Sequence, residues 1–121
     1  MEELRGYPIG IDLDFAAAAE FVAGSQARVN PETYLYKFSY VMMPGSPLGA
    51  FHGEELYFVF RPAQVTPDEA GTRVSDTMMS LWTRFAATGD PSGGNVTWPR
   101  YTAENGTYLD IGAVPVVKTG Y

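Results

Sequence analysis

The sequence predicts an α/β fold. Three observations indicate this class: an amphipathic helix pattern near the start, an aromatic strand pattern after it, and a long capped helix followed by short strands. Helices and strands in this order along one chain suggest α/β architecture. With 121 residues, 45% of them hydrophobic, residues 1–121 can form one domain or one large piece of a bigger domain.

The first helix is predicted from about Asp14 to Ala23. Asp12 or Asp14 would cap its N-terminus, and Gly24 would stop it. Four residues recur at the spacing of one helix face, which we expect to face the core: Phe15, Ala18, Ala19 and Val22.

A strand is predicted over residues 34–41, where aromatic side chains alternate with other residues. Residues 42–50 are predicted to be a loop, because they contain two prolines and two glycines. His52 follows this loop, at a position where functional residues concentrate. The aromatic residues expected on one face of the strand are Tyr34, Tyr36, Phe38 and Tyr40.

A long helix is predicted to begin with a capping box formed by Thr66 and Glu69, with Pro67 at the first helical position. Gly71 lowers the helix propensity of the first turn by about 1 kcal/mol relative to alanine. Gly89 would end the helix. The apolar stripe expected to face the core consists of Val74, Met78, Leu81, Trp82 and Phe85.

The remaining elements are short. Periodicity does not distinguish a helix from a strand in the apolar run of residues 56–60. Residues 108–111 and 114–118 suggest a terminal hairpin, in which Pro115 restricts the second strand to a sheet edge. Only the strand over residues 34–41 is convincing by itself. Because a lone central strand cannot pair its own backbone, we expect further polypeptide or self-association to complete the chain.

The composition argues against several classes of function. The formal charge is −6 and the eight basic residues are scattered, so we expect no nucleic-acid partner and no membrane partner. The absence of cysteine excludes disulfides, a thiol nucleophile and thiolate metal sites. No signal peptide and no run of about 20 apolar residues is present, which favours a cytoplasmic location.

His52 is the only histidine, and therefore the only imidazole that could act as a general base. By itself, a solitary histidine is more often structural or solvated than catalytic. A metal site is disfavoured, since His52, Glu54 and Glu55 lack the spacing of a zinc motif. The two adjacent glutamates also cannot lie on opposite sides of a sugar, which argues against glycosidase chemistry.

A serine nucleophile served by such a base sits at a strained strand-to-helix turn with the pattern G-x-S-x-G. None of the six serines has glycine both two residues before it and two residues after it, and no Gly-Gly-Gly oxyanion loop is present. A base without these partners is expected to give no meaningful esterase rate. The serines are Ser25, Ser39, Ser46, Ser75, Ser80 and Ser92.

Four segments together carry a resemblance to a known family. Residues 49–60, around His52, resemble the histidine segment of type-B carboxylesterases, the family that includes cholinesterases and bacterial para-nitrobenzyl esterases. Residues 81–91 resemble the family's W-x-x-F-A-x-T-G-D-P helix end, and residues 98–101 its W-P-x-Y turn. Residues 34–38 match the aromatic strand before the histidine loop. These segments agree with the family in order and spacing over most of the chain.

The resemblance implies that the chain is the C-terminal part of an α/β-hydrolase fold and thus an incomplete domain. His52 would be the triad histidine, whose Nε2 takes the nucleophile's proton and later returns it to the leaving alcohol. The serine and the triad acid would lie upstream of Met1, so we expect this chain to need a complementing chain to hydrolyse carboxylic esters. Glu55 would be structural and residues 56–60 helical. No cofactor is implied.

A second interpretation belongs to a different class: a non-catalytic, self-associating or binding module derived from a hydrolase. The aromatic face of residues 34–40 and the helix face of Met78 and Trp82 would then be exposed and buried by self-association. The size of the particle in solution would separate the two interpretations.

Overall fold

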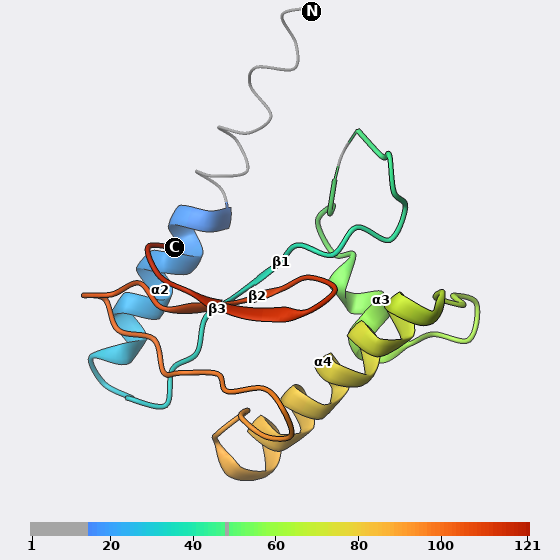
Figure 1. Cartoon of the computed structure of the whole chain (residues 1–121). Coiled ribbons are helices and arrows are strands. Elements are labelled where there is room, and N and C mark those ends of the chain that lie inside the picture. Colours follow the sequence, from blue (N-terminus) through green and yellow to red (C-terminus); the bar gives the residue numbers. More distant parts are fainter. Residues whose placement is uncertain (1–14, 48) are drawn as a thin grey trace, which may run out of the picture.

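A three-stranded sheet separates helix α2 from helices α3 and α4 (Figure 1). The computed structural model describes residues 15–47 and 49–121. The arrangement of helices on both sides of the sheet agrees with the predicted α/β class. The elements follow in the order α2 (Ala17–Ala27), β1 (Tyr36–Phe38), α3 (Glu55–Phe60), α4 (Glu69–Thr88), β2 (Tyr108–Ile111) and β3 (Pro115–Lys118).

The strands lie in the order β1–β2–β3. β1 runs parallel to β2, with Tyr36 beside Leu109 and Phe38 beside Ile111. β2 and β3 form the predicted antiparallel hairpin, and Pro115 begins the edge strand. The edge position suits proline, which has no N–H to donate to another strand.

β1 is shorter than the strand predicted over residues 34–41. Its ladder ends at Phe38, and the N–H groups of Ser39 and Tyr40 both donate to the carbonyl of Ile111. Two consecutive donors to one acceptor break the regular ladder spacing, so the chain leaves the sheet here. The predicted alternation is confirmed, because the aromatic side chains pack toward α4 while Leu35 packs toward α2.

The main core lies between the sheet and α4. Met78 and Leu81 of α4 are buried against Leu109 and Ile111 of β2. The aromatic side chains of residues 34–40 pack around the same cluster. The two apolar faces that the second interpretation assigned to self-association therefore pack against each other within one chain and are partly buried there, and self-association stays a prediction.

The start of α4 differs from the predicted capping box. Asp68 is the N-cap, and its carboxylate accepts the N–H of Gly71 at 2.7 Å, so the helix begins two residues later than Thr66 would require. Gly71 is buried because α3 packs closely on this turn. A Cβ at this position would lie 2.8 Å from the Cβ of Pro67 and 3.4 Å from the ring of Phe58.

α2 differs from prediction in its end and in its buried face. The helix runs through Gly24 to Ala27, because the residues around this glycine keep helical hydrogen bonds. The buried face is formed by alanines, with Ala23 buried against Leu35 and Tyr101. Phe15 and Val22 are instead exposed by 49% and 63%. The proposed caps Asp12 and Asp14 lie outside the described residues.

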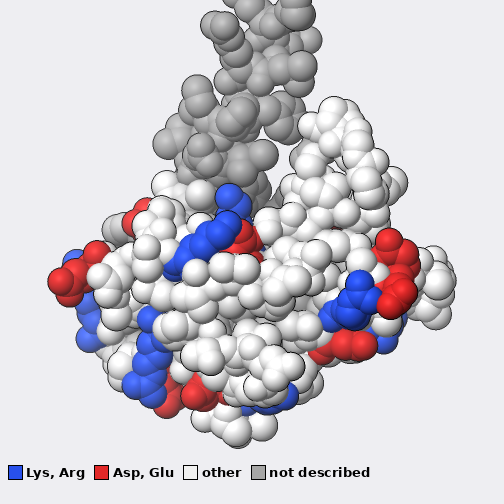
Figure 2. All heavy atoms as spheres, viewed as in Figure 1, with Lys and Arg blue, Asp and Glu red and all other residues white. Residues whose placement is uncertain are grey.

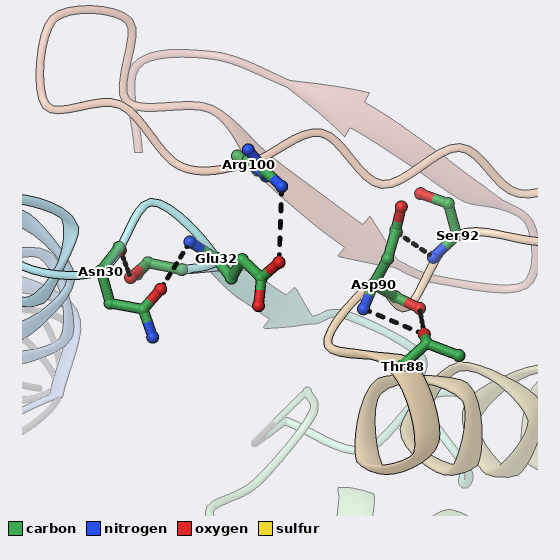
Figure 3. Close-up of polar contacts among 7 residues, drawn as sticks. Asn30, Glu32, Thr88, Asp90, Ser92 and Arg100 are labelled. Carbon is green, nitrogen blue, oxygen red and sulfur yellow. Dashed lines mark hydrogen bonds and ion pairs between the residues drawn. The ribbon is translucent and has the colours of Figure 1, made fainter.

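Residues 88–91, the T-G-D-P part of the motif, form a tight turn at the end of α4 (Figure 3). Gly89 has a φ of 78°, the left-handed conformation common at helix C-termini. The hydroxyl of Thr88 accepts the N–H of Asp90 at 3.1 Å, and the Asp90 carboxylate accepts the N–H of Ser92 at 2.9 Å. This part of the motif therefore has a structural role.

The W-P-x-Y turn attaches the chain after α4 to the start of β1. The indole of Trp98 donates to the carbonyl of Leu35 at 3.1 Å, and the N–H of Tyr101 donates to the carbonyl of Thr33 at 2.7 Å. Arg100 forms an ion pair with Glu32 at 3.6 Å across the same junction (Figure 3). The turn thereby holds β1 in place.

The surface carries charges of both signs. Acidic and basic side chains are interspersed on the face in Figure 2, with uncharged surface between them. Over residues 15–47 and 49–121, no helix combines the length and the apolar character that crossing a membrane requires.

Candidate active site

His52 lies in the turn between the loop of residues 42–51 and α3, and its side chain is exposed. Its ring contacts the ring of Phe15, with 4.7 Å between centroids and 31° between the ring planes. Gly53 follows with a φ of 83°, a conformation that other residues rarely adopt. The glycine thus lets the backbone turn sharply into α3 directly after the histidine.

Glu54 is the buried carboxylate of this turn, with only 1% of its surface exposed. Its Oε1 accepts the N–H of Met42 at 3.0 Å, and its Oε2 accepts the N–H of Phe51 at 3.1 Å. Glu55, for which the family resemblance implies a structural role, is half-buried in the first turn of α3. The structure gives the loop-anchoring role to Glu54.

α3 is in turn fixed to α4 by a buried hydroxyl. Ser75 is fully buried; it donates to the carbonyl of Phe58 at 2.6 Å and accepts the Nε–H of Arg61 at 2.9 Å. The guanidinium of Arg61 also forms an ion pair with Asp76 at 2.6 Å. These contacts hold Arg61 at a φ of 42°, in the left-handed region where α3 ends.

Three of the serine hydroxyls form hydrogen bonds within the structural framework. Ser39 donates to the carboxylate of Asp110, Ser75 to the carbonyl of Phe58, and Ser92 to the carbonyl of Trp98. None of these bonds involves His52. The described residues contain no group of three or more histidine, aspartate or glutamate side chains placed to hold a metal ion.

An apolar cavity lies elsewhere, between β1 and α4. It has a volume of about 180 Å³ and is lined by aromatic rings, including those of Tyr36, Trp82 and Trp98. None of the lining residues belongs to the His52 turn. The cavity is therefore separate from the candidate active site.

The model of one protein family, described as the carboxylesterase family, matches residues 11–121. The chain belongs to the carboxylesterase family. Bile salt-activated lipase of Rattus norvegicus is 44% identical over an aligned length of 92 residues, and the match covers 66% of this chain and 15% of that protein. Carboxylesterase 1D of Mus musculus is 33% identical over an aligned length of 111 residues, and the match covers 84% of this chain and 19% of that protein.

Solved structures agree with this carboxylesterase assignment. Two structures of PNB esterase match with TM-scores of 0.81 and 0.80, at 29% and 30% identity. They cover 90% and 92% of this chain, and this chain covers 24% of theirs. The structure is therefore part of an α/β-hydrolase fold, as the sequence resemblance implied. The chain spans between 15% and 19% of the length of the two curated relatives.

Sequence reasoning missed two residues that shape the His52 turn of this carboxylesterase segment, Glu54 and Ser75. Glu54 stands beside Glu55, and nothing in the local pattern tells which of the two points inward. Ser75 lies next to Val74 of the predicted apolar stripe, which was the available signal that its side chain is buried. Both make hydrogen bonds to residues 12 or more positions away in the sequence, which no local pattern reports.

Proposed function

We propose that His52 is the general base of a carboxylic ester hydrolase, and that residues 1–121 need further hydrolase polypeptide to act. Membership of the carboxylesterase family is the observation that carries this proposal. The placement of His52 supports it, because the ring is exposed at a turn whose backbone is anchored on both sides.

The chemistry of the proposed site is acyl transfer to water. Nε2 of His52 takes the proton of a serine hydroxyl as that oxygen attacks the ester carbonyl. The ring then returns this proton to the departing alcohol. In the second half of the reaction it takes a proton from the water that attacks the acyl intermediate, and it gives that proton to the serine oxygen as the acid is released. The negative oxygen of each tetrahedral intermediate needs positioned N–H donors, which supply a large share of the rate.

The nucleophile and the N–H donors would come from polypeptide other than residues 1–121. No serine of this chain has the G-x-S-x-G surroundings, and Ser39, Ser75 and Ser92 already serve structural hydrogen bonds. The partner of this chain is accordingly a complementing hydrolase segment.

Two features favour such a partner. Within the described sheet, β1 pairs with β2 on one side only, so its other edge is available for another strand. Large apolar side chains are also exposed, among them Phe21 at 76%, Val22 at 63% and Phe60 at 75%. Phe21 and Val22 are neighbours on α2, so their exposed side chains offer apolar surface that another segment can cover.

A complementation assay tests the proposal. The chain is mixed with an N-terminal segment of a PNB esterase that lacks the region matching this chain, and hydrolysis of para-nitrophenyl butyrate is followed. We expect no rate above buffer from the chain alone and a clear rate from the mixture. Replacing His52 with glutamine should abolish that rate, because an amide cannot accept and return the proton.

Two results would contradict the proposal. One is full activity of the isolated chain that is lost when one of its own serines is replaced. The other is complemented activity that survives His52→Gln. Size-exclusion chromatography of the mixture, run beside each component, establishes whether the two segments associate, and it also reveals self-association of the chain.

A further inference from the structure

Residues 42–47 and 49–51 are the described part of the loop that precedes His52. Its described backbone hydrogen bonds within the loop are short-range: the N–H of Ser46 donates to Met43, and the N–H of Gly49 donates to Ser46. Two prolines and two glycines rule out a regular ladder or helix in this segment. Contacts at the ends of the loop therefore help to set the backbone position of His52, whose ring also contacts the ring of Phe15.

Glu54 makes those contacts. One carboxylate oxygen binds the N–H of Met42 at the start of the loop, and the other binds the N–H of Phe51 at its end. The N–H of Glu54 also donates to the carbonyl of Phe51 at 3.1 Å, which closes the turn around His52. A single side chain thus joins both ends of the loop to the residue that begins α3.

This junction is connected to the rigid part of the molecule. The side chain of Met42 packs on the main core, and α3 is bonded to α4 through Phe58 and Ser75. A carboxylate that is 99% buried is costly unless hydrogen bonds compensate its lost hydration. For holding α3 alone, an apolar side chain would serve as well or better. The two hydrogen bonds that the Glu54 carboxylate accepts fix the positions of the two loop ends.

We propose that Glu54 is a positioning residue, which sets the direction of the His52 ring by holding both ends of its loop through backbone N–H groups. This inference rests on the proposed function of His52. It predicts that changing Glu54 affects the turnover of bound ester and leaves ester binding largely unchanged, since the carboxylate is buried and does not reach the ring's exposed side.

Glu54→Gln is the decisive variant. Glutamine has the same shape but only one acceptor oxygen, so its NH₂ group would face one of the two N–H donors. Glu55→Gln is the matched control, because it removes the same charge one residue away, while both loop N–H groups of Met42 and Phe51 donate to Glu54. Glu54→Asp keeps both oxygens on a side chain one methylene shorter and serves as a milder second variant.

Amide hydrogen exchange on the full 121-residue chain provides the first readout. We expect Glu54→Gln to raise the exchange rates of Met42 and Phe51 by at least tenfold, while amides in the core of α4 such as Met78 keep their rates. The imidazole signals of His52, the only histidine, should shift or broaden at the same time. Glu54→Asp should change the same signals in the same direction, and Glu55→Gln should leave them unchanged.

The complemented esterase provides the second readout. We expect Glu54→Gln to lower kcat by tenfold or more with KM within about twofold, and Glu55→Gln to leave both within twofold. Equal behaviour of the Glu54 and Glu55 variants in exchange and in kcat would overturn the inference. If the wild-type chain gives no complemented activity, the proposed function of His52 fails, whereas the exchange rates still decide whether Glu54 holds the loop. Should Glu54→Gln unfold, Glu54→Asp decides by the same criteria.

Discussion

Replacing Ser75 with alanine should destabilise the fold by about 2 kcal/mol, because two hydrogen bonds between α3 and α4 are lost together. The hydroxyl of Ser75 donates to the carbonyl of Phe58 and accepts from Arg61, and both Ser75 and Phe58 are fully buried.

The magnitude comes mainly from the Phe58 carbonyl. Leaving a buried acceptor without a partner costs about 1–3 kcal/mol. The guanidinium of Arg61 adds little, since its side chain is 35% exposed and keeps its contacts with Asp76 and the Thr72 carbonyl. For a chain of this size, a loss of 2 kcal/mol corresponds to a decrease in Tm of roughly 6–12 °C.

Urea denaturation followed by tryptophan fluorescence measures this effect. Trp82 and Trp98 contact each other with 5.8 Å between ring centroids, beside the core that α4 forms, so their emission reports on the packing of α4. The denaturation midpoint should fall while the slope stays constant. Ser80→Ala on the same helix is the control, and it should change stability by less than about 0.5 kcal/mol.

The reasoning would be refuted if Ser75→Ala and Ser80→Ala gave the same midpoint. A change confined to the slope would mean that the denatured state had been altered, not the α3–α4 contact. In the complemented esterase, the Ser75 variant should also lose activity at temperatures where the wild type is stable, because α3 carries the turn that holds His52.

Two further predictions concern stability. Gly89→Ala should destabilise the fold by about 1–2 kcal/mol, because Gly89 has a φ of 78°. Gly24→Ala in the middle of α2 should instead stabilise the fold by roughly 0.5–1 kcal/mol. Urea midpoints of the two variants are measured side by side, and shifts in the same direction would contradict the prediction. Asp110 predicts an acid dependence: burial acts to raise its pKa, but hydrogen bonds from Lys118 and Ser39 outweigh this and lower the pKa below the ordinary 3.8. The stabilisation from Asp110 is thus fully present above pH 3.8 and is lost as the pH falls toward the lower pKa of the folded state. Asp110→Asn should therefore weaken the dependence of the free energy of unfolding on pH in this acid range. An unchanged dependence would contradict the lowered pKa of Asp110.

Local patterns predicted most of the elements. The aromatic alternation around Tyr36 located β1, the apolar stripe ending near Phe85 located α4, and Pro115 located the sheet edge. These predictions succeeded because each depends on a period or a backbone restriction that is written into neighbouring residues. The errors were at helix ends and faces. Asp68, and not Thr66, caps α4, and the buried face of α2 is formed by alanines and not by Val22.

The roles of the acidic residues could not be predicted from neighbours. Glu54 and Glu55 are adjacent and chemically identical, and their difference arises because the N–H groups of Met42 and Phe51 converge on Glu54 alone. The same holds for Ser75, whose partners lie 14 and 17 positions away. The meeting of such groups depends on how α3 packs on α4.

By itself, the sequence determined the family resemblance, the identity of the sole imidazole, and the absence of a serine in G-x-S-x-G surroundings, because these depend only on residue types and their spacing. The tertiary structure decided which carboxylate anchors the histidine turn and which apolar faces cover each other. Both depend on hydrogen bonds and packing between residues far apart in the chain, whose geometry exists only once the sheet and helices are assembled.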